Sequence, residues 1–271
     1  MEKFPFVIGT TSMIFGADLL ANVRRLAASV QVIEIVLFKT PDLHNLPSPS
    51  EIAELKRIGA GENLRFSVHL PASLEPASAD RQTRKAALAD GPEICRRFAA
   101  LDPEHFILHL PFSKPTLVPI PDFYFHEKQP RSDWDAWTAR AAEALEQFQK
   151  TLAGPERLLV ENINYSPCFL TPFLEADLCR LCLDIGHLLL GREPVAAHLE
   201  QFRAWIREIH LHGVVGYNEH ISLRHLPEQR LGKWLQVLEG QDYRGWINLE
   251  LFDPQDLQES LQLLRDRFGS G

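Results

Sequence analysis

Eight short apolar segments recur along the 271-residue chain, separated by stretches with helical periodicity. Short apolar runs bounded by turn residues predict buried strands. The predicted strands are Phe6–Thr11, Val32–Phe38, Leu64–Leu70, His105–Leu110, Leu158–Asn162, Leu181–Gly186, Glu208–Gly213 and Trp246–Phe252. Strands that alternate with helices form a parallel sheet, and eight such units close into a (β/α)8 barrel. We therefore predict an α/β fold with one barrel domain over residues 1–271.

The segments between the strands begin with residues that commonly cap helices. The clearest predicted starts are Asp18 before Leu19–Val30, Ser50 before Glu51–Ile58, Ser78 before a helix that reaches about Ala100, Asp133 before Trp134–Thr151, and Asp253 before Gln255–Phe268. Weaker helical patterns cover Pro172–Ala176, Pro194–Trp205 and Glu228–Leu238. The long connection from Pro111 to Ser132 is rich in proline and aromatic residues, so we expect either a lid over the mouth or a rigid surface loop.

Imidazole and carboxylate side chains stand where most of the predicted strands end. They are His69, His109, Glu161, Asp184, His187, His210, His212 and Glu250. A charge inside a core costs several kcal/mol unless it is paired or bound to a metal. Because the carboxyl ends of all barrel strands meet at one mouth, these side chains should converge there. Nitrogen and oxygen ligands of this kind suit Zn, Mn, Fe or Co, and two or three ions would polarise a phosphoryl oxygen and activate water.

The composition limits which kinds of molecule the protein is expected to bind and where in the cell it is expected to work. A net charge of −8 disfavours nucleic acid or an anionic membrane surface as the partner. The first residues lead straight into a strand and no apolar run approaches the roughly 18 residues of a membrane span, so we expect a soluble, cytoplasmic protein. Four cysteines do not form a disulfide framework, and Cys179 and Cys182, three apart on one strand, should pack as thiols on opposite faces.

Glu34 interrupts the second predicted strand with a carboxylate. It is a candidate for a general base or substrate contact at the mouth. A buried ion pair with Arg or Lys explains it equally well, since perturbed carboxylates also occur in structural ion networks. Asn162 and Asn164, which flank the fifth strand end, are candidates to orient Glu161.

The motifs at the strand ends resemble those of the xylose-isomerase-like barrels, a superfamily that includes endonuclease IV. Glu161-Asn162, Asp184-Ile185-Gly186-His187, His210-Leu211 and Glu250 resemble its motifs on strands five to eight. These positions fit sugar isomerases and epimerases as well as nucleases. His69 and His109 resemble the two early histidines of the endonuclease IV type, and His220 falls where that enzyme has a metal-binding histidine.

The resemblance implies a set of ligands for up to three metal ions. One ion would bind His69, His109 and Glu161, a second would bind Glu161, Asp184, His210 and Glu250, and a third would use His187 and His220. Asn218 stands where the nuclease has an aspartate ligand, which leaves the third site weak, completed by water or absent. The resemblance leaves His212, Asn162 and Asn218 as candidate contacts to the substrate.

Short fragments along most of the chain resemble more closely the cobamide-remodelling phosphodiesterases of the same superfamily. They include Ile8-Gly9-Thr10-Thr11-Ser12, Ser67-Val68-His69-Leu70-Pro71 and Ile209-His210-Leu211-His212-Gly213-Val214. This resemblance implies a metal-dependent hydrolase that cleaves the nucleotide loop of a corrinoid such as cobalamin to cobinamide phosphate and α-ribazole, with Glu161, Glu250 and Glu34 as catalytic candidates. The alternatives are a sugar isomerase or epimerase, an endonuclease, and a barrel that binds a corrinoid or metal without turnover. The oligomeric state stays open.

Overall fold

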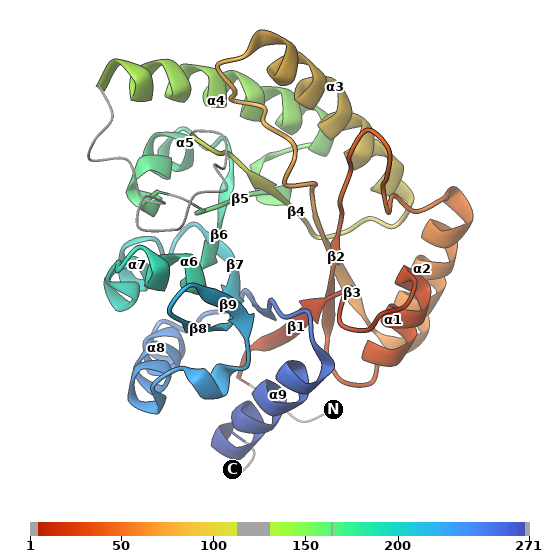
Figure 1. Ribbon diagram of the computed structural model, residues 1–271, viewed down its shortest axis with the longest axis vertical. Coiled ribbons are helices and arrows are strands. Elements are labelled where there is room, and N and C mark those ends of the chain that lie inside the picture. Colours follow the sequence, from red (N-terminus) through yellow and green to blue (C-terminus); the bar gives the residue numbers. More distant parts are fainter. Residues whose placement is uncertain (1–4, 113–130, 164, 269–271) are drawn as a thin grey trace.

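Eight parallel strands close into a barrel, as the computed structural model of residues 5–112, 131–163 and 165–268 shows (Figure 1). The strands are β1 (Val7–Thr11), β2 (Val32–Val36), β3 (Arg65–His69), β4 (His105–His109), β5 (Leu158–Glu161), β6 (Arg180–Asp184), β7 (Ile206–Leu211) and β10 (Trp246–Leu249). Their order around the barrel is β1-β10-β7-β6-β5-β4-β3-β2, and every neighbouring pair is parallel. The predicted barrel is confirmed, with strand ends displaced by one to three residues.

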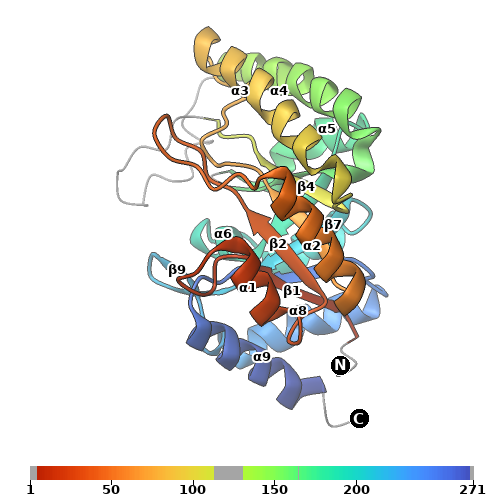
Figure 2. The ribbon, with the colours of Figure 1, turned by 90° about the vertical axis from the view of Figure 1, so that its right-hand side faces the viewer.

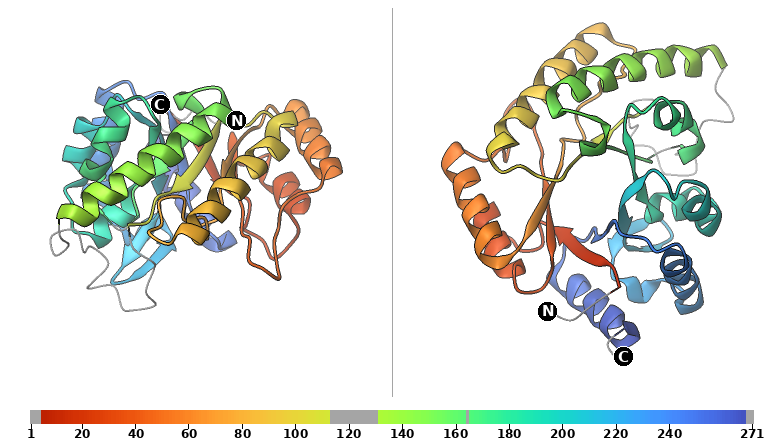
Figure 3. Two further views of the ribbon diagram at one scale, coloured as in Figure 1. Left: turned by 90° about the horizontal axis from the view of Figure 1, so that it is seen from above. Right: turned by 180° about the vertical axis from the view of Figure 1, so that it is seen from behind.

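Helices surround the barrel and cover its outer face (Figures 1 and 3). The α-helices are α1 (Leu19–Leu26), α2 (Pro49–Glu62), α3 (Arg81–Arg97), α4 (Arg131–Leu152), α5 (Thr171–Glu175), α6 (Ile185–Leu190), α7 (Val195–Gln201), α8 (Glu228–Gly240) and α9 (Pro254–Phe268). Single turns of 3-10 helix are η1 (Phe98–Ala100), η4 (Pro155–Arg157), η5 (Pro167–Leu170) and η6 (Leu223–His225). No helix in the described ranges combines the length and the apolar character needed to cross a membrane.

Three predicted helix starts are wrong and two are confirmed. Ser48, not Ser50, caps α2, because Pro49 takes the first helical position and Glu51 closes a capping box with Ser48. Asp80, not Ser78, caps α3 by accepting a hydrogen bond from the Thr83 N–H. The helix expected to open at Asp133 begins earlier, at Arg131. Asp18 and Asp253 accept hydrogen bonds from the first turns of α1 and α9, as predicted.

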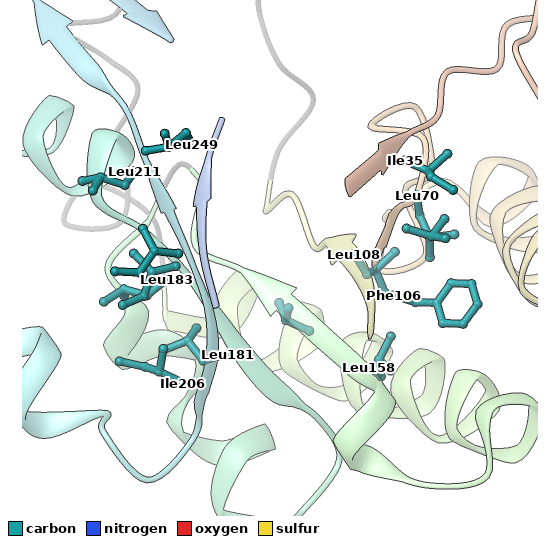
Figure 4. Close-up of a cluster of buried hydrophobic side chains, with 14 of the residues drawn as sticks. Ile35, Leu70, Phe106, Leu108, Leu158, Leu181, Leu183, Ile206, Leu211 and Leu249 are labelled. Atoms are coloured by element: carbon teal, nitrogen blue, oxygen red, sulfur yellow. The ribbon is translucent and has the colours of Figure 1, made fainter. Parts of the chain in front are cut away.

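Each strand divides its side chains between the helices and the barrel interior, since successive residues point to opposite faces. Outward side chains such as Ile35, Leu108 and Leu183 are buried against the helices and form the main core (Figure 4). Inside the barrel a small apolar layer of Ile107, Leu159 and Cys182 forms a second cluster. Cys182 therefore faces inward while Cys179 belongs to the outer core, and both are free thiols as predicted.

A hairpin that the sequence did not predict follows β7. It consists of β8 (Gly213–Val215) and β9 (Asn218–Ile221), which pair antiparallel apart from the barrel sheet. The hairpin projects from the same side of the barrel as the loop between β2 and α2 (Figures 2 and 3). It places residues 213–221 over the carboxyl ends of the strands.

Candidate metal centre

The inward side chains at the carboxyl ends of seven strands converge on one buried cluster. On six of these strands the alternation puts the donor at or just beyond the last inward position, and Glu34 stands one inward position earlier, in the middle of β2. These donors are Glu34 (β2), His69 (β3), His109 (β4), Glu161 (β5), Asp184 (β6), His210 (β7) and Glu250, which directly follows β10. His187 in α6, His212 after β7 and His220 in β9 lie around the same cluster. The convergence expected from the strand ends is therefore observed.

Glu161 lies at the middle of the cluster and turns its two oxygens toward different imidazoles. Oε2 lies 3.0 Å from the Nε2 atoms of both His69 and His109. Oε1 lies 3.5 Å from Nδ1 of His210 and 3.5 Å from Nε2 of His187. A carboxylate arranged in this way can bridge two metal positions.

The ring of His69 is held by a backbone carbonyl. Its Nδ1 lies 2.9 Å from the Leu70 carbonyl oxygen, which can only accept, so Nδ1 carries the hydrogen. Nε2 of the neutral ring then turns its lone pair toward Glu161 Oε2 at 3.0 Å. Two lone pairs at this distance need a cation between them. Two ligands that each lie about 2.1 Å from one ion are roughly 3.0–3.5 Å apart, so a metal fits as well as a proton.

His210 is oriented in the same manner by Glu34. Its Nε2 lies 2.9 Å from Glu34 Oε2, and both side chains are fully buried. When Nε2–H donates to Glu34, the Nδ1 lone pair faces Glu250 Oε2 at 3.3 Å, Glu161 Oε1 at 3.5 Å and Asp184 Oδ2 at 3.9 Å. Neither His210 Nδ1 nor Glu250 Oε2 makes a hydrogen bond within the described chain. Buried polar atoms are normally satisfied, so these two are available to an ion.

Asp184 and His212 form a further layer beneath the mouth. Asp184 Oδ1 accepts a hydrogen bond of 2.6 Å from the His187 N–H and caps α6, while Oδ2 faces His210 and His212. His212 Nδ1 lies 3.0 Å from the His220 backbone N and 3.3 Å from the Gly213 carbonyl oxygen, and its Nε2 lies 3.3 Å from Asp184 Oδ2. Gly186 makes room for this ring, because a Cβ there would lie 1.9 Å from His212 Cε1.

Charge favours a divalent ion in this cluster. Four carboxylate donors are buried in the described ranges, namely Glu34, Glu161, Asp184 and Glu250, and no Lys or Arg of those ranges is buried with them. Burial by itself would lower the pKa of His69, but the hydrogen bond with Glu161 and the nearby Glu34 and Glu250 charges raise that pKa to about 9. Burial likewise opposes the charge on His212, and Asp184 outweighs it and raises the pKa of His212 to about 9. Protons thus take the place that metal ions can fill.

Two sets of donors match the metal sites implied by the sequence resemblance. His69, His109 and Glu161 form one set, and Glu161, Asp184, His210 and Glu250 form the other, each with ligand atoms within 4.8 Å of one another. His220 groups differently from the expectation, because it joins His212 and Glu250 rather than His187. The donor sets could hold divalent metal ions, and the mixture of imidazole and carboxylate suits Zn, Mn, Fe or Co.

The remaining candidate residues from the sequence have the following surroundings. Asn162 is fully buried and clasps the backbone of Asp184 through hydrogen bonds of 2.8 and 3.0 Å, so it positions that residue instead of facing the mouth. Glu34 pairs with His210 and not with Arg or Lys. His212 is fully buried, and Asn218 is exposed on the hairpin. Asn164 and residues 113–130, the expected lid, lie outside the described residues.

Two acidic residues of the cluster were not singled out from the sequence. Glu208 lies inside the barrel, fully buried, where burial and the nearby Glu34 raise its pKa well above the usual range. Glu219 lies between two imidazoles, 3.8 Å from His187 Nδ1 and 3.8 Å from His220 Nε2. The inward register of β7 would have indicated Glu208, because it stands two residues before His210. Glu219 depends on the hairpin, for which the sequence carried no clear signal.

The sequence matches a known family over most of its length. Residues 23–267 match the family described as the xylose isomerase-like TIM barrel. The chain belongs to this family. No curated protein matches the sequence. The family match assigns the barrel to this superfamily and does not distinguish one branch of the family from another.

Solved structures of the same fold include enzymes of two kinds. A D-tagatose 3-epimerase-like protein aligns with a TM-score of 0.72 and 20% identity over 96% of this chain and 99% of that one. D-psicose 3-epimerase from Clostridium cellulolyticum aligns with a TM-score of 0.72 and 15% identity over 97% and 98%. Endonuclease IV from Thermus thermophilus aligns with a TM-score of 0.69 and 16% identity over 98% and 100%. At these identities the likeness is one of fold.

Proposed function

We propose that the protein is a metal-dependent hydrolase of phosphodiesters with a binuclear centre bridged by Glu161. The observation that carries the proposal is that the two oxygens of this carboxylate face different pairs of histidines. Oε2 faces His69 and His109, and Oε1 faces His210 and His187. Two ions held in this way would polarise the phosphoryl group, activate water and stabilise the leaving oxygen.

The residues of the chain have distinct tasks in this reaction. Water attacks phosphorus, one P–O ester bond breaks, and the products are a phosphomonoester and an alcohol that takes up a proton. Glu250 Oε2 makes no hydrogen bond within the described residues, and we assign to it the proton that the water loses. Glu34 keeps the His210 lone pair turned to the centre. His187 and His220 have side chains 11% and 24% exposed and line the approach from the mouth.

We propose further that the substrate is a corrinoid, cleaved in its nucleotide loop to cobinamide phosphate and α-ribazole. Support for this substrate comes from the sequence fragments around Ile8–Ser12, Ser67–Pro71 and Ile209–Val214, which resemble cobamide-remodelling phosphodiesterases. The net charge of −8 agrees with a single phosphodiester in a small molecule better than with DNA, which binds through many Lys and Arg contacts.

A sugar epimerase or isomerase is the second candidate, and the fold comparisons favour it. Two of the structural relatives reported above are epimerases or epimerase-like. Glu161 and Glu250 both lie close to His210 Nδ1, at 3.5 and 3.3 Å, and an epimerase would use two such carboxylates to exchange a proton on a substrate carbon. That chemistry leaves His69 and His109 without a task, and it needs Glu161 free of a bridging role.

One experiment separates the candidates. The purified protein, with its metal content measured, is incubated with adenosylcobalamin, with D-fructose and with an oligonucleotide that carries an abasic site, and the products are identified by mass spectrometry. We expect cobinamide phosphate and α-ribazole, abolished by Glu161→Ala and unaffected by Glu239→Ala on the exposed face of α8. An epimerised sugar with intact corrinoid would replace the proposal with the epimerase. Cleavage of the oligonucleotide alone would replace it with an endonuclease.

A further inference from the structure

The large apolar side chains that the described chain leaves exposed are confined to one face of the barrel. They are Met13, Leu43, Val215, Tyr217 and Phe252, with exposed fractions of 40, 63, 54, 55 and 40%. Scattered exposed apolar residues are ordinary, whereas their confinement to one region marks a binding surface. We call these five residues the apolar rim.

The apolar rim follows four consecutive strands of the barrel. Met13 comes after β1, Leu43 after β2, Val215 and Tyr217 after β7, and Phe252 after β10. Because β2, β1, β10 and β7 are successive neighbours in the barrel, these loops form one continuous arc around the mouth. The hairpin and the loop after β2 extend from the same side in two views (Figures 2 and 3).

The segments that carry the rim are the same ones that hold the donors. The Phe252 ring packs edge-on against His220, with ring centroids 5.1 Å apart, and the ring centroids of His220 and His212 are 4.2 Å apart. Tyr217 and Val215 belong to the hairpin whose second strand carries His220. Met13 donates its backbone N–H to the Thr11 hydroxyl, which in turn donates to the Leu251 carbonyl beside Glu250. The rim therefore borders the donors on the side of β2, β1, β10 and β7, where a molecule whose phosphate reaches the centre can contact it.

Charge in the same loops argues against a polyanion. Among the described residues of the four rim loops the fixed cations are Lys39 and Arg224. Lys39 is paired with Asp90, and Arg224 lies in η6, in a groove formed with α8 and α9. Nucleic acid needs a row of such cations, and a free sugar needs hydrogen-bonding groups along its edge. The five rim side chains carry no cation and, apart from the Tyr217 hydroxyl, no group that would suit the hydroxyls of a sugar.

We infer that the apolar rim binds the non-reacting part of the substrate, and that the substrate is a phosphodiester carrying a broad organic group with an apolar face. This inference rests on the proposed phosphodiesterase function and adds to it the surface that selects the substrate. The five side chains differ in sequence position by more than 200 residues, yet they act as one surface because the barrel brings their loops together. Recognition of the organic group then determines KM, and the donors at the centre determine kcat.

The test compares cleavage of adenosylcobalamin with cleavage of bis(4-nitrophenyl) phosphate, a small diester. The double variant Val215→Ser/Tyr217→Ser replaces two side chains that are more than half exposed, so it keeps the fold. We expect the KM for adenosylcobalamin to rise tenfold or more, about 1.4 kcal/mol, with kcat within twofold. The preference for adenosylcobalamin over the small diester, as the ratio of kcat/KM values, should fall by the same factor. Gln236→Ser, a change at an exposed position in α8 away from the mouth, should alter neither value.

Different failures point to different conclusions. An unchanged KM in the double variant would overturn the inference. So would a wild-type dimer that the double substitution dissociates in sedimentation analysis, because the rim would then bind a second copy. Cleavage of the small diester without binding or cleavage of adenosylcobalamin would overturn the inference and leave the phosphodiesterase standing. Binding of adenosylcobalamin that the double variant weakens, with no cleavage of either diester, would support the rim and overturn the proposed reaction.

Discussion

The contact between Glu34 and His210 allows a quantitative prediction for metal affinity. The substitution Glu34→Gln keeps the size of the side chain and removes its charge. Glu34 Oε2 accepts the His210 Nε2–H at 2.9 Å in a fully buried setting. A hydrogen bond to a charged group contributes about 1.5–3 kcal/mol and a neutral one about 0.5–1.5 kcal/mol, so the loss is about 1–2 kcal/mol. This corresponds to metal binding that is roughly 5- to 30-fold weaker at the set that contains His210.

The assay is a competition between a chromophoric chelator and metal-stripped protein for Zn²⁺ or Mn²⁺. Glu208→Gln is the matched control, because Glu208 is also fully buried in the barrel and its raised pKa favours the neutral form that Gln imitates. We expect Glu208→Gln to bind metal within about twofold of the wild type, well under 1 kcal/mol. Equal affinity of Glu34→Gln and wild type would refute the argument. An equal loss of metal affinity in both variants would show that any buried acidic residue of the barrel has this effect. The hydrogen bond between Glu34 and His210 would then not be its cause.

Three further predictions follow from the same cluster. His109→Ala should release one of two tightly bound metal ions per chain and lower phosphodiester cleavage about 100-fold, by analogy with loss of other metal partners; full metal content by mass spectrometry would contradict a binuclear centre. In metal-stripped protein, His69 and His212 have pKa values raised from 6.5 to about 9, so their stabilisation is present below pH 6.5 and lost as the pH rises through about 9. Urea unfolding should therefore give lower stability at pH 9.5 than at pH 6.5, and a flat profile would count against the raised values. Gly186→Ala should lower stability by about 1–3 kcal/mol and impair metal binding by displacing His212, whereas Gly61→Ala, where a Cβ meets nothing within 4 Å, should not.

The barrel and the positions of its donors could be predicted because both follow from local patterns. Apolar runs identify strands, and the end of a parallel strand places a side chain at the common mouth. His69, His109, Glu161, Asp184, His210 and Glu250 all follow from this rule without knowledge of any contact. Their gathering in one cluster is observed, and their roles as ligands stay a prediction.

The partners of these residues could not be predicted in the same way, because they depend on register across the barrel. Glu34 and His210 are 176 positions apart in sequence, and their contact requires β2 and β7 to bring both side chains to one height. The start of α2 was predicted wrongly for a local reason. Ser48 and Ser50 are both good caps, and only the Pro49 position and the capping box with Glu51 select the first. The β8–β9 hairpin was missed because its strands have three and four residues.

The two roles of Asp184, as a helix cap and as a neighbour of the donors, affect the interpretation of this position in related sequences. One oxygen of Asp184 starts α6 and the other faces the donors, so the spacing from Asp184 to His187 is that of a helix cap to its third residue. A relative without catalysis would still gain stability from a capping residue there, and Ser, Thr or Asn can cap a helix as Asp does. An aspartate at this position is therefore by itself weak evidence that a relative keeps the donor set. His69 and His109 cap no helix in the described ranges, so their presence in a relative would better indicate the donor set of His69, His109 and Glu161.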